Sequence, residues 1–426
     1  MPTWTSEQVA SLAPDASSVA AARCLAAPRL WSSTGMDDRA VWGQCRGYSV
    51  AIDVPGPGFT CTCPSRKVPC KHGLGLLMLW AAYPDVVGRA EAPAWVEEWL
   101  AGRARRAART PVERKPPDPE ARAKRMAGRA ARIGSGLEEL DLWLRDLVRQ
   151  GLASAQGRPF GYWDEMAARM VDAQAPGVGG QVRRMAGIVR SGDGWPGRLL
   201  VQAGRLHLVA EAWSRFDALP PETQADLRTV TGWSWTSEEV RAGPLVRDRW
   251  SVVARSIADE ERFRIVRTWL MAAGRAALIL EFLSAFEPLP GELGLGTTVD
   301  ADLAFFPGAW PQRALVARTH GEAEPMAEWH GSTTVEEALA EHARALAANP
   351  WLDRLPMVLS DVVPVADGWR VRDSTGAAVR LLLDEDAWWT LAAVSGGRPV
   401  GVAGEWQDGA LRALSVWADR RLTPLV

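Results

Sequence analysis

The chain has 426 residues, of which 47% are hydrophobic and 23% charged, with 49 Lys and Arg against 51 Asp and Glu. This length predicts about two to four domains, and the apolar share excludes a fully disordered chain. A net charge of −2 gives no general attraction to nucleic acid or to a membrane. No apolar run reaches the roughly 18–20 residues of a membrane helix. No basic residue precedes Arg23, so no signal peptide is indicated and we expect a cytoplasmic protein.

The first hundred residues predict a small mixed domain over 1–102. Thr5 with Gln8 forms a capping-box pattern, and Asp15 can cap a second, alanine-rich helix. The runs AVWGQCRG and YSVAIDV predict two strands, and the following PGPG predicts a turn. The segment FTCTCPSRKVPCKHGLGLLMLWAA comes next, and its second half is typical of a helix.

A basic, proline-containing linker is predicted over 103–132. It carries eleven Lys or Arg and three Asp or Glu, so its charge is +8 while the rest of the chain is −10. We expect it to become helical near Ala121. Two interpretations stay open: a solvated tether, or an arm that contacts phosphates. Arginine is abundant throughout the chain and indicates GC-rich coding, so arginine content alone carries little functional weight.

The region 133–247 is predicted to be helical, because Leu137, Leu140 and Leu144 recur at helical spacing. Further helices are expected over 162–173, 180–190, 197–215 and 222–230. The 22 tryptophans follow no fixed period, and we expect most of them to be buried or half-buried packing residues.

The region 248–426 is predicted to be α+β and rich in strands. Its strand-like runs are WSVVARSI, FRIVRTWL, AALILEF, DADLAFF, RALVAR, GWRVRD and AVRLLL. One helix is expected after Thr333, with Glu336 completing a capping box, and another near Trp388. The expected fold class is therefore α+β, with an antiparallel sheet in the C-terminal half.

Three of the five cysteines fall within ten residues, and with one histidine they form a metal-binding pattern. Cys61 and Cys63, then Cys70 and His72, supply three thiols and one imidazole, a complete set for one structural Zn²⁺. In extended chain Cys61 and Cys63 point the same way, and the other two lie where a helix begins near Gly73. Thiolates favour zinc over magnesium or calcium. Arg66, Lys67 and Lys71 can offset the net charge of the site, and the remaining cysteines, Cys24 and Cys45, are expected to be small buried residues.

The segment from Arg39 to Trp80 resembles the SWIM zinc-finger family, whose pattern is Cys-x-Cys, a variable gap, then Cys-x-His. By motif match, the four residues named above would be the metal ligands. The resemblance implies a ββα finger and a role in binding DNA or protein. The whole chain looks like the stand-alone bacterial SWIM zinc-finger proteins, and this implies a MoxR-type AAA ATPase or a von Willebrand factor A protein as partner.

Other motifs are interpreted as structural. Gly192, Gly194 and Gly197 match GxGxxG, but residues at helical spacing precede them, so we expect a turn between helices. The sequence contains no Walker A loop, HExxH or GxSxG motif. A second metal could in principle use histidines and glutamates of the C-terminal half, which we interpret as surface residues: His320, Glu322, Glu324, His330 and His342.

The leading hypothesis is a structural zinc-binding interaction protein that recognises a protein or a nucleic acid and no membrane. Four protein ligands close the zinc shell, whereas catalytic zinc keeps one position open, so we do not expect an enzyme. The overall acidity favours a protein partner, while Arg66, Lys67 and the 103–132 segment favour nucleic acid. The alternative is an enzyme with an unrecognised site in the C-terminal half.

Overall fold

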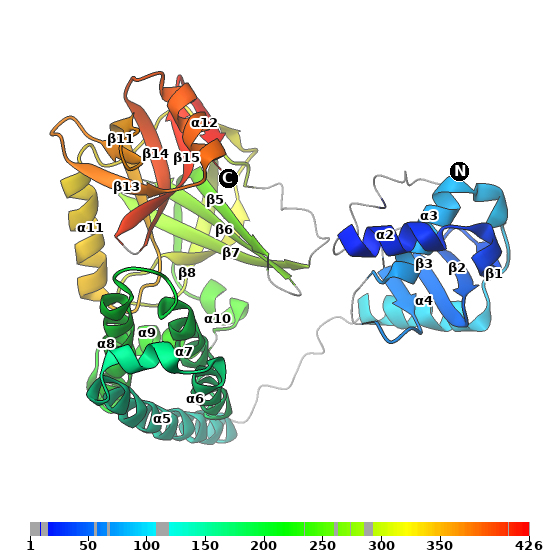
Figure 1. Ribbon diagram of the computed structural model, residues 1–426, viewed down its shortest axis with the longest axis horizontal. Coiled ribbons are helices and arrows are strands. Elements are labelled where there is room, and N and C mark those ends of the chain that lie inside the picture. The colour runs from blue at the N-terminus through cyan, green and yellow to red at the C-terminus, as the bar shows by residue number, and fades with distance from the viewer. Residues whose placement is uncertain are drawn as a thin grey trace. The chain divides into compact units, whose positions relative to one another are not determined.

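The computed structural model describes residues 9, 16–54, 58–65, 69–107, 119–233, 235–259, 263–272, 274–284, 293–407 and 409–425. They fall into two units, Met1–Pro117 and Asp118–Val426, each considered by itself (Figure 1). The expected caps Thr5, Gln8 and Asp15, most of the PGPG turn, and Arg66 and Lys67 lie outside the described residues. None of the described helices combines the length and apolar character needed to cross a bilayer.

Unit 1 is built on a four-stranded antiparallel sheet in the order β1-β2-β3-β4. The strands are β1 (Trp31–Met36), β2 (Ala40–Cys45), β3 (Tyr48–Asp53) and β4 (Gly58–Cys61). The runs AVWGQCRG and YSVAIDV are confirmed as β2 and β3, whereas β1 was not predicted. The helices are α2 (Ala16–Leu25), α3 (Lys71–Ala82) and α4 (Ala94–Ala107), with short 3-10 turns η1 (Pro28–Leu30) and η2 (Pro84–Val86).

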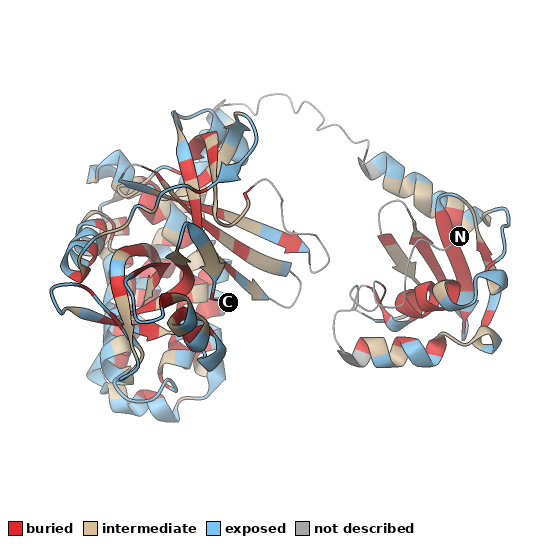
Figure 2. Ribbon diagram, turned by 90° about the horizontal axis from the view of Figure 1, so that it is seen from above, coloured by how far each residue is buried: buried red, intermediate tan, exposed pale blue. Residues whose placement is uncertain are grey.

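Both faces of the unit 1 sheet are covered, because alternate residues of its central strands serve two hydrophobic clusters. Val41 and Ile52 pack with α2 and α3 in the larger cluster. Their neighbours Trp42 and Ala51 pack with α4 on the opposite face. Figure 2 shows the resulting buried layer between exposed helix faces.

Helix α3 is the centre of unit 1, buried on all sides from His72 to Trp80. Helix α2 packs closely against it at Gly75. A Cβ atom added at Gly75 would lie 3.0 Å from the Cβ of Leu25 and 3.5 Å from the carbonyl oxygen of Ala22. A glycine therefore lets the two helices approach each other here.

Unit 2 begins with a helical bundle that confirms the predicted helices to within a few residues. Its helices are α5 (Pro119–Arg149), α6 (Phe160–Asp172), α7 (Pro176–Ile188), α8 (Trp195–Trp213) and α9 (Pro221–Thr231), with η3 (Leu152–Gly157) and η4 (Phe216–Ala218) between them. The leucines of the predicted pattern, among them Leu137, Leu140 and Leu144, lie in the bundle core. A short helix, α10 (Ser237–Arg241), follows and was not predicted.

The basic segment predicted as a linker over 103–132 is largely helical in the described residues. Its first residues finish α4, and α5 already begins at Pro119, slightly before the expected Ala121. Proline is favoured in the first turn of a helix, and the Ala and Arg that follow are good helix formers. Residues 103–107 and 119–132 are therefore helical, although the composition indicated a linker.

The strand-rich half of unit 2 contains two closed five-stranded barrels in place of a single antiparallel sheet. Barrel 1 consists of β5 (Leu245–Asp259), β6 (Phe263–Ala272), β7 (Arg275–Ser284), β8 (Thr297–Phe305) and β9 (Arg313–Thr319), with β10 (Glu324–Pro325) beside β8. Barrel 2 consists of β11 (Leu355–Val365), β12 (Arg370–Arg372), β13 (Ala378–Leu382), β14 (Val400–Gln407) and β15 (Ala410–Ala418), with β16 (Arg421–Pro424) beside β15. All seven strand-like runs of the sequence are confirmed as strands of these barrels.

The two barrels share one topology. In each, the first strand pairs with the second, the second with the third, the third in parallel with the fifth, the fifth with the fourth, and the fourth with the first. A register shift in the first strand, at Val252–Ala254 in β5 and Leu359–Val362 in β11, lets one strand serve two neighbours. In barrel 2 a helix, α12 (Glu385–Ser395), connects the third and fourth strands. This is the strand order of the OB-fold, a five-stranded Greek-key barrel.

Helix α11 (Val335–Ala348) joins the barrels, and its N-cap differs from the expectation. Thr334, not Thr333, is the N-cap, and Glu337, not Glu336, completes the capping box. Glu337 also accepts hydrogen bonds from the backbone and hydroxyl of Thr333, so both threonines belong to the same cap. Helix α12 confirms the helix expected near Trp388.

Most tryptophans are buried or half-buried, as the sequence analysis expected. Among those that the structure describes, Trp389 stands apart with 61% of its surface exposed. Trp269 and Trp250 are fully buried in barrel 1. The large number of tryptophans therefore reflects packing throughout both units.

Candidate metal centre

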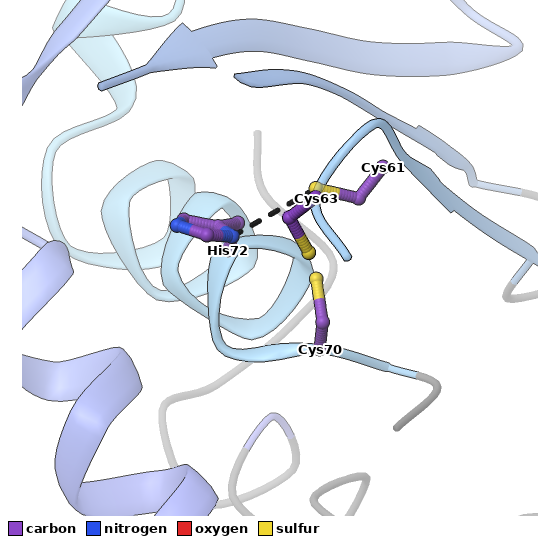
Figure 3. Close-up of side chains that lie close together, drawn as sticks. All are labelled: Cys61, Cys63, Cys70 and His72. Atoms are coloured by element: carbon purple, nitrogen blue, oxygen red, sulfur yellow. Dashed lines mark hydrogen bonds between the residues drawn. The ribbon is translucent and has the colours of Figure 1, made fainter. Parts of the chain in front are cut away.

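The four residues of the Cys-x-Cys and Cys-x-His pairs come together at one end of α3 (Figure 3). Cys61 is the last residue of β4, and Cys63 lies in the bend that follows. Cys70 is the N-cap of α3, and His72 lies in the first turn of that helix. Strands β3 and β4 with α3 form the expected ββα arrangement, and α3 begins at Lys71, two residues before the predicted start.

The geometry of this cluster fits zinc. The three sulfur atoms and one imidazole nitrogen all lie within 4.8 Å of one another. The Sγ of Cys61 is 3.8 Å from Nδ1 of His72. Zinc bonds of about 2.3 Å to sulfur and about 2.0–2.1 Å to nitrogen place tetrahedral ligand atoms roughly 3.5–3.8 Å apart. Thus the cluster suits a zinc-binding domain that holds one ion.

Packing holds the imidazole and the helix start in place. His72 is 3% exposed, and its ring centroid lies 5.0 Å from that of Tyr48 on β3. A Cβ atom added at Gly73 would lie 3.0 Å from the ring of Phe59 on β4, so this glycine lets the first turn of α3 approach the strand. The side chains are therefore preorganised by the hydrophobic core beneath them.

The electrostatics of the cluster favour a thiolate at Cys70. The pKa of the Cys70 thiol is lowered to about 4, chiefly by a hydrogen bond from Cys61 and also by the backbone N–H groups of Gly73 and His72 at the helix start, against the effect of burial. The same contact with Cys70, together with burial, raises the pKa of the Cys61 thiol above its ordinary range. Because thiolates are the metal-binding form, the cluster offers a negative charge at the position that a cation would occupy.

The other two cysteines differ from each other. Cys45 is fully buried, as expected. Cys24 is exposed on α2, which corrects the expectation that it is a small buried residue. Its helix presents only part of its surface to α3, and Cys24 lies on the other part. Sequence spacing alone did not show which face of this alanine-rich helix packs against the core.

The glycine motif is a turn between helices, as predicted. Gly192 and Gly194, with φ of 79° and 77°, lie between α7 and α8, and Pro196 is in the first turn of α8. The histidines of the C-terminal half make local contacts. Nε2 of His320 is 2.9 Å from a carboxylate oxygen of Asp302, and His330 is exposed beside Glu328. His342 is partly buried against Trp406 rather than on the surface.

A second group of possible metal ligands was missed by the sequence analysis. Asp141 of α5 meets His207 and Glu211 of α8, with Nδ1 of His207 2.5 Å from Oδ1 of Asp141. Arg145 also reaches this group, 2.7 Å from Asp141 and 3.4 Å from Glu211. Its guanidinium already supplies the cation, so we interpret the group as an ion-pair network between the two helices. The only sequence signal was the i, i+4 spacing of His207 and Glu211.

A cavity of about 610 Å³ lies within unit 2, between α9, α10, α11 and both barrels. Phe305, Phe306 and Trp310 give it an apolar wall. Its titratable lining residues are Glu222, Glu239, Arg275, Glu341 and His342.

Comparison with known families identifies the helical bundle. Residues 128–231 match the model of the SWIM-associated four-helix bundle domain. The helical bundle of this chain is therefore similar to a SWIM-associated domain. The matched region runs from α5 to the last residue of α9, so the resemblance carried by the cysteine motif is supported by a separate part of the chain. The match concerns the bundle and does not itself name the finger. No curated protein and no solved structure matches the chain.

Proposed function

We propose that this chain is a SWIM-type, structural zinc-binding interaction protein that holds one Zn²⁺ through Cys61, Cys63, Cys70 and His72. The observation that carries the proposal is the convergence of four donor atoms within 4.8 Å. Three thiolates and one imidazole complete a tetrahedral shell and leave no position for a substrate or a water. The proposal therefore assigns the ion to folding and recognition, and no catalysis to it.

The ion would link the end of β4 to the first turn of α3. Phe59 of β4 packs in the same hydrophobic cluster as α3, and this core depends on the position of the helix. In isolated zinc-finger peptides, metal binding contributes about 10–16 kcal/mol of apparent folding free energy. We therefore expect the unit 1 fold to depend on zinc, while unit 2 has its own cores and remains folded without it.

Metal content tests the assignment. The purified chain should contain one zinc per molecule, and Cys63→Ser should lose it and make unit 1 sensitive to protease. The matched control is Cys24→Ser, because Cys24 is an exposed thiol of the same unit and should leave zinc content unchanged. Stoichiometric zinc in a Cys61→Ser, Cys63→Ser double variant would contradict the assignment.

For unit 1 we propose a protein partner rather than nucleic acid. Three of its arginines are paired with carboxylates of the same unit: Arg39 with Asp37 and Glu97, Arg89 with Asp38, and Arg103 with Asp53. Charges paired in this way are less available to phosphates. The SWIM resemblance favours a MoxR-type AAA ATPase or a von Willebrand factor A protein as that partner. The reduced thiols of the site suit the cytoplasm.

Direct mixing tests this partner. A purified MoxR-type ATPase should co-elute with the zinc-loaded chain on a sizing column, and nuclease treatment should not change the complex. The Cys63→Ser variant should lose the complex, whereas Cys24→Ser should keep it. A complex that disappears on nuclease treatment would instead indicate nucleic acid as the partner.

A further inference from the structure

The outer surface of barrel 2 carries a cluster of arginines on neighbouring strands. Arg370 and Arg372 alternate with the buried Val371 on β12, and Arg380 is exposed on β13. Arg412 of β15 is half-exposed and registers with Leu382 of β13, next to Arg380. We call Arg370, Arg372, Arg380 and Arg412 the arginine face.

The arginine face lowers the stability of barrel 2. Arg370 lies directly opposite Arg380 in the antiparallel pair of β12 and β13. Like charges at such positions are destabilising, because the side chains are about 5 Å apart at their Cβ atoms. Within the described part of the chain, no carboxylate forms an ion pair with any of the four arginines, whereas many arginines elsewhere are paired. The four arginines of this face therefore form a positively charged surface that is complementary to a polyanionic ligand.

A hollow adjoins the arginine face at the loop between the first two strands of barrel 2. It has a volume of about 530 Å³ and is lined by this loop and by the end of β13. Trp369 of the loop lines it, with its ring stacked at 6.0 Å on that of Trp388 of α12. The backbone φ of Trp369 is 45°, in the left-handed region that a bulky residue rarely adopts. This strained conformation holds an aromatic ring beside the arginines.

The strand order of barrel 2 relates the arginine face and Trp369 to a single surface. In OB-folds, oligonucleotides and oligosaccharides bind on the face of the second and third strands, between the loop that joins strands one and two and the loop that joins strands four and five. Strands β12 and β13 are the second and third strands of barrel 2, and Trp369 lies in the first of these loops. We propose that the arginine face and Trp369 bind single-stranded DNA, with the arginines contacting phosphates and the indole stacking on a base.

The chemistry of the face distinguishes this ligand from its alternatives. A neutral oligosaccharide offers no charge to satisfy four arginines. A duplex has its bases stacked inside and cannot use the indole, whereas a single strand offers both phosphates and free base faces. RNA would be distinguished by side chains that hydrogen-bond to its 2′-hydroxyl. Beside the arginines lie Ala378 and Leu382 of β13 and, paired with β12, Val363 and Val365 of β11, and none of these four side chains can hydrogen-bond to a 2′-hydroxyl.

Titration with a labelled oligothymidylate of about 20 nucleotides tests the proposal on the full chain. Four phosphate contacts on a single strand predict a slope of about −2.8 for log K against log salt. The variant Arg370→Gln, Arg372→Gln, Arg380→Gln should flatten this slope by about two units and weaken binding on the order of ten-fold or more at 50 mM salt. Its thermal stability should not fall, because the substitutions remove like-charge repulsion.

A charge-matched control separates this site from general attraction. Arg241, Arg318 and Arg344 are exposed arginines of unit 2 on α10, β9 and α11. Replacing all three by Gln should leave the DNA affinity and its salt slope near those of the wild type. Equal losses in both triple variants would overturn the proposal, as would a full chain that shows no binding at 50 mM salt.

The stacking role of Trp369 is tested separately. Trp369→Ala should weaken binding roughly 5- to 150-fold, and Trp369→Phe should keep most of it. Circular dichroism checks that both variants fold. If Trp369→Ala does not fold, Trp369→Phe and the triple arginine variant still test the proposal. Tighter binding of the matching duplex or RNA would overturn the assignment to single-stranded DNA.

The proposal does not rest on zinc. Cys63→Ser should lose metal yet bind the oligonucleotide as the wild type does, because the arginine face belongs to unit 2. Loss of DNA binding in this variant would place the site in unit 1 and overturn the inference for barrel 2.

Discussion

The indole N–H of Trp269, in barrel 1, donates a hydrogen bond to Oε1 of Glu405, in barrel 2, with a donor–acceptor distance of 3.0 Å. Glu405 has no exposed surface, and its other oxygen lies 2.7 Å from Nη1 of Arg354. Val253 and Leu414 pack in the same interface. The two barrels are therefore joined by a hydrophobic contact with a fully satisfied carboxylate at its centre.

We expect Glu405→Ala to destabilise unit 2 by about 1–3 kcal/mol, because it leaves the buried indole N–H of Trp269 without an acceptor and removes the ion-pair partner of Arg354. Chemical unfolding of the wild type and the variant measures this difference. The control is Glu324→Gln, which removes an ion pair with Arg249 whose side chains are both 67% exposed. That change should cost no more than about 1 kcal/mol. A Glu405→Ala variant as stable as the control would contradict the role given to this carboxylate.

Cobalt substitution tests whether the metal shell is closed. The Co²⁺-loaded chain should show the absorption of a tetrahedral, thiolate-rich site with no water ligand, because four protein donors converge on one point. Common substrates of zinc hydrolases should not turn over. The variant His72→Gly should open one position and admit an exchangeable water. An exchangeable water already present in the wild-type site would favour the enzymatic alternative.

The pH dependence of unit 2 should show a contribution from Asp226. Burial raises the pKa of this carboxyl group to about 6, against a hydrogen bond from the N–H of Ala309 that lowers it. Because the folded pKa lies above the unfolded value of 3.8, this contribution is present below about pH 4 and is lost as the pH rises to about 6. The loss is on the order of 2–3 kcal/mol.

The variant Asp226→Asn should remove this dependence, since an amide can still accept from Ala309 but carries no charge. Thermal unfolding between pH 4 and 8 would show a smaller decline for the variant. Asp353, a carboxylate that is 53% exposed in its pair with Arg184, is the control position. If the two variants have parallel pH profiles, burial does not control the ionisation of Asp226.

Two arginines of the basic segment 103–132 contact other side chains, so a mutational test has to separate these contacts from binding. Nε of Arg103 is 2.9 Å from Asp53, and its guanidinium lies over the ring of Trp99. Arg129 stacks on Trp233 in the same way. We therefore expect Arg103→Gln to destabilise unit 1 by about 1 kcal/mol, as seen by unfolding, whereas Arg105→Gln, at an exposed position, should be neutral.

A phosphate-contacting arm would use its exposed residues. The variant Arg105→Gln, Lys124→Gln, Arg125→Gln removes exposed charges. If the arm contacts phosphates, this variant should flatten the salt slope of nucleic-acid binding by about two units. An unchanged slope supports the tether. The zinc content should be the same in either case.

The sequence by itself determined the candidate metal ligands and many of the secondary-structure elements. The spacing of Cys61, Cys63, Cys70 and His72 predicted the cluster because ligand types and short-range geometry are local. The strands of barrel 1, β12 and β13 of barrel 2, and the long helices of the bundle followed from hydrophobic period, which reflects each element's own burial, whereas β11, β14 and β15 were not predicted. The helix boundaries shifted by a few residues, as at Thr334, because two adjacent threonines compete for one cap.

Only the tertiary structure decided how these elements close. The pairing of β13 with β15 and of β7 with β9 joins segments that no local pattern relates, so two barrels replaced the expected sheet. The same closure brought Arg412 beside Arg380 and Trp369 beside them, although coding bias had made each arginine uninformative alone. Cys24 was misjudged for a related reason, because the exposure of a residue depends on which neighbours cover it. Sequence periodicity describes one element at a time, whereas a surface is made by the elements that come together.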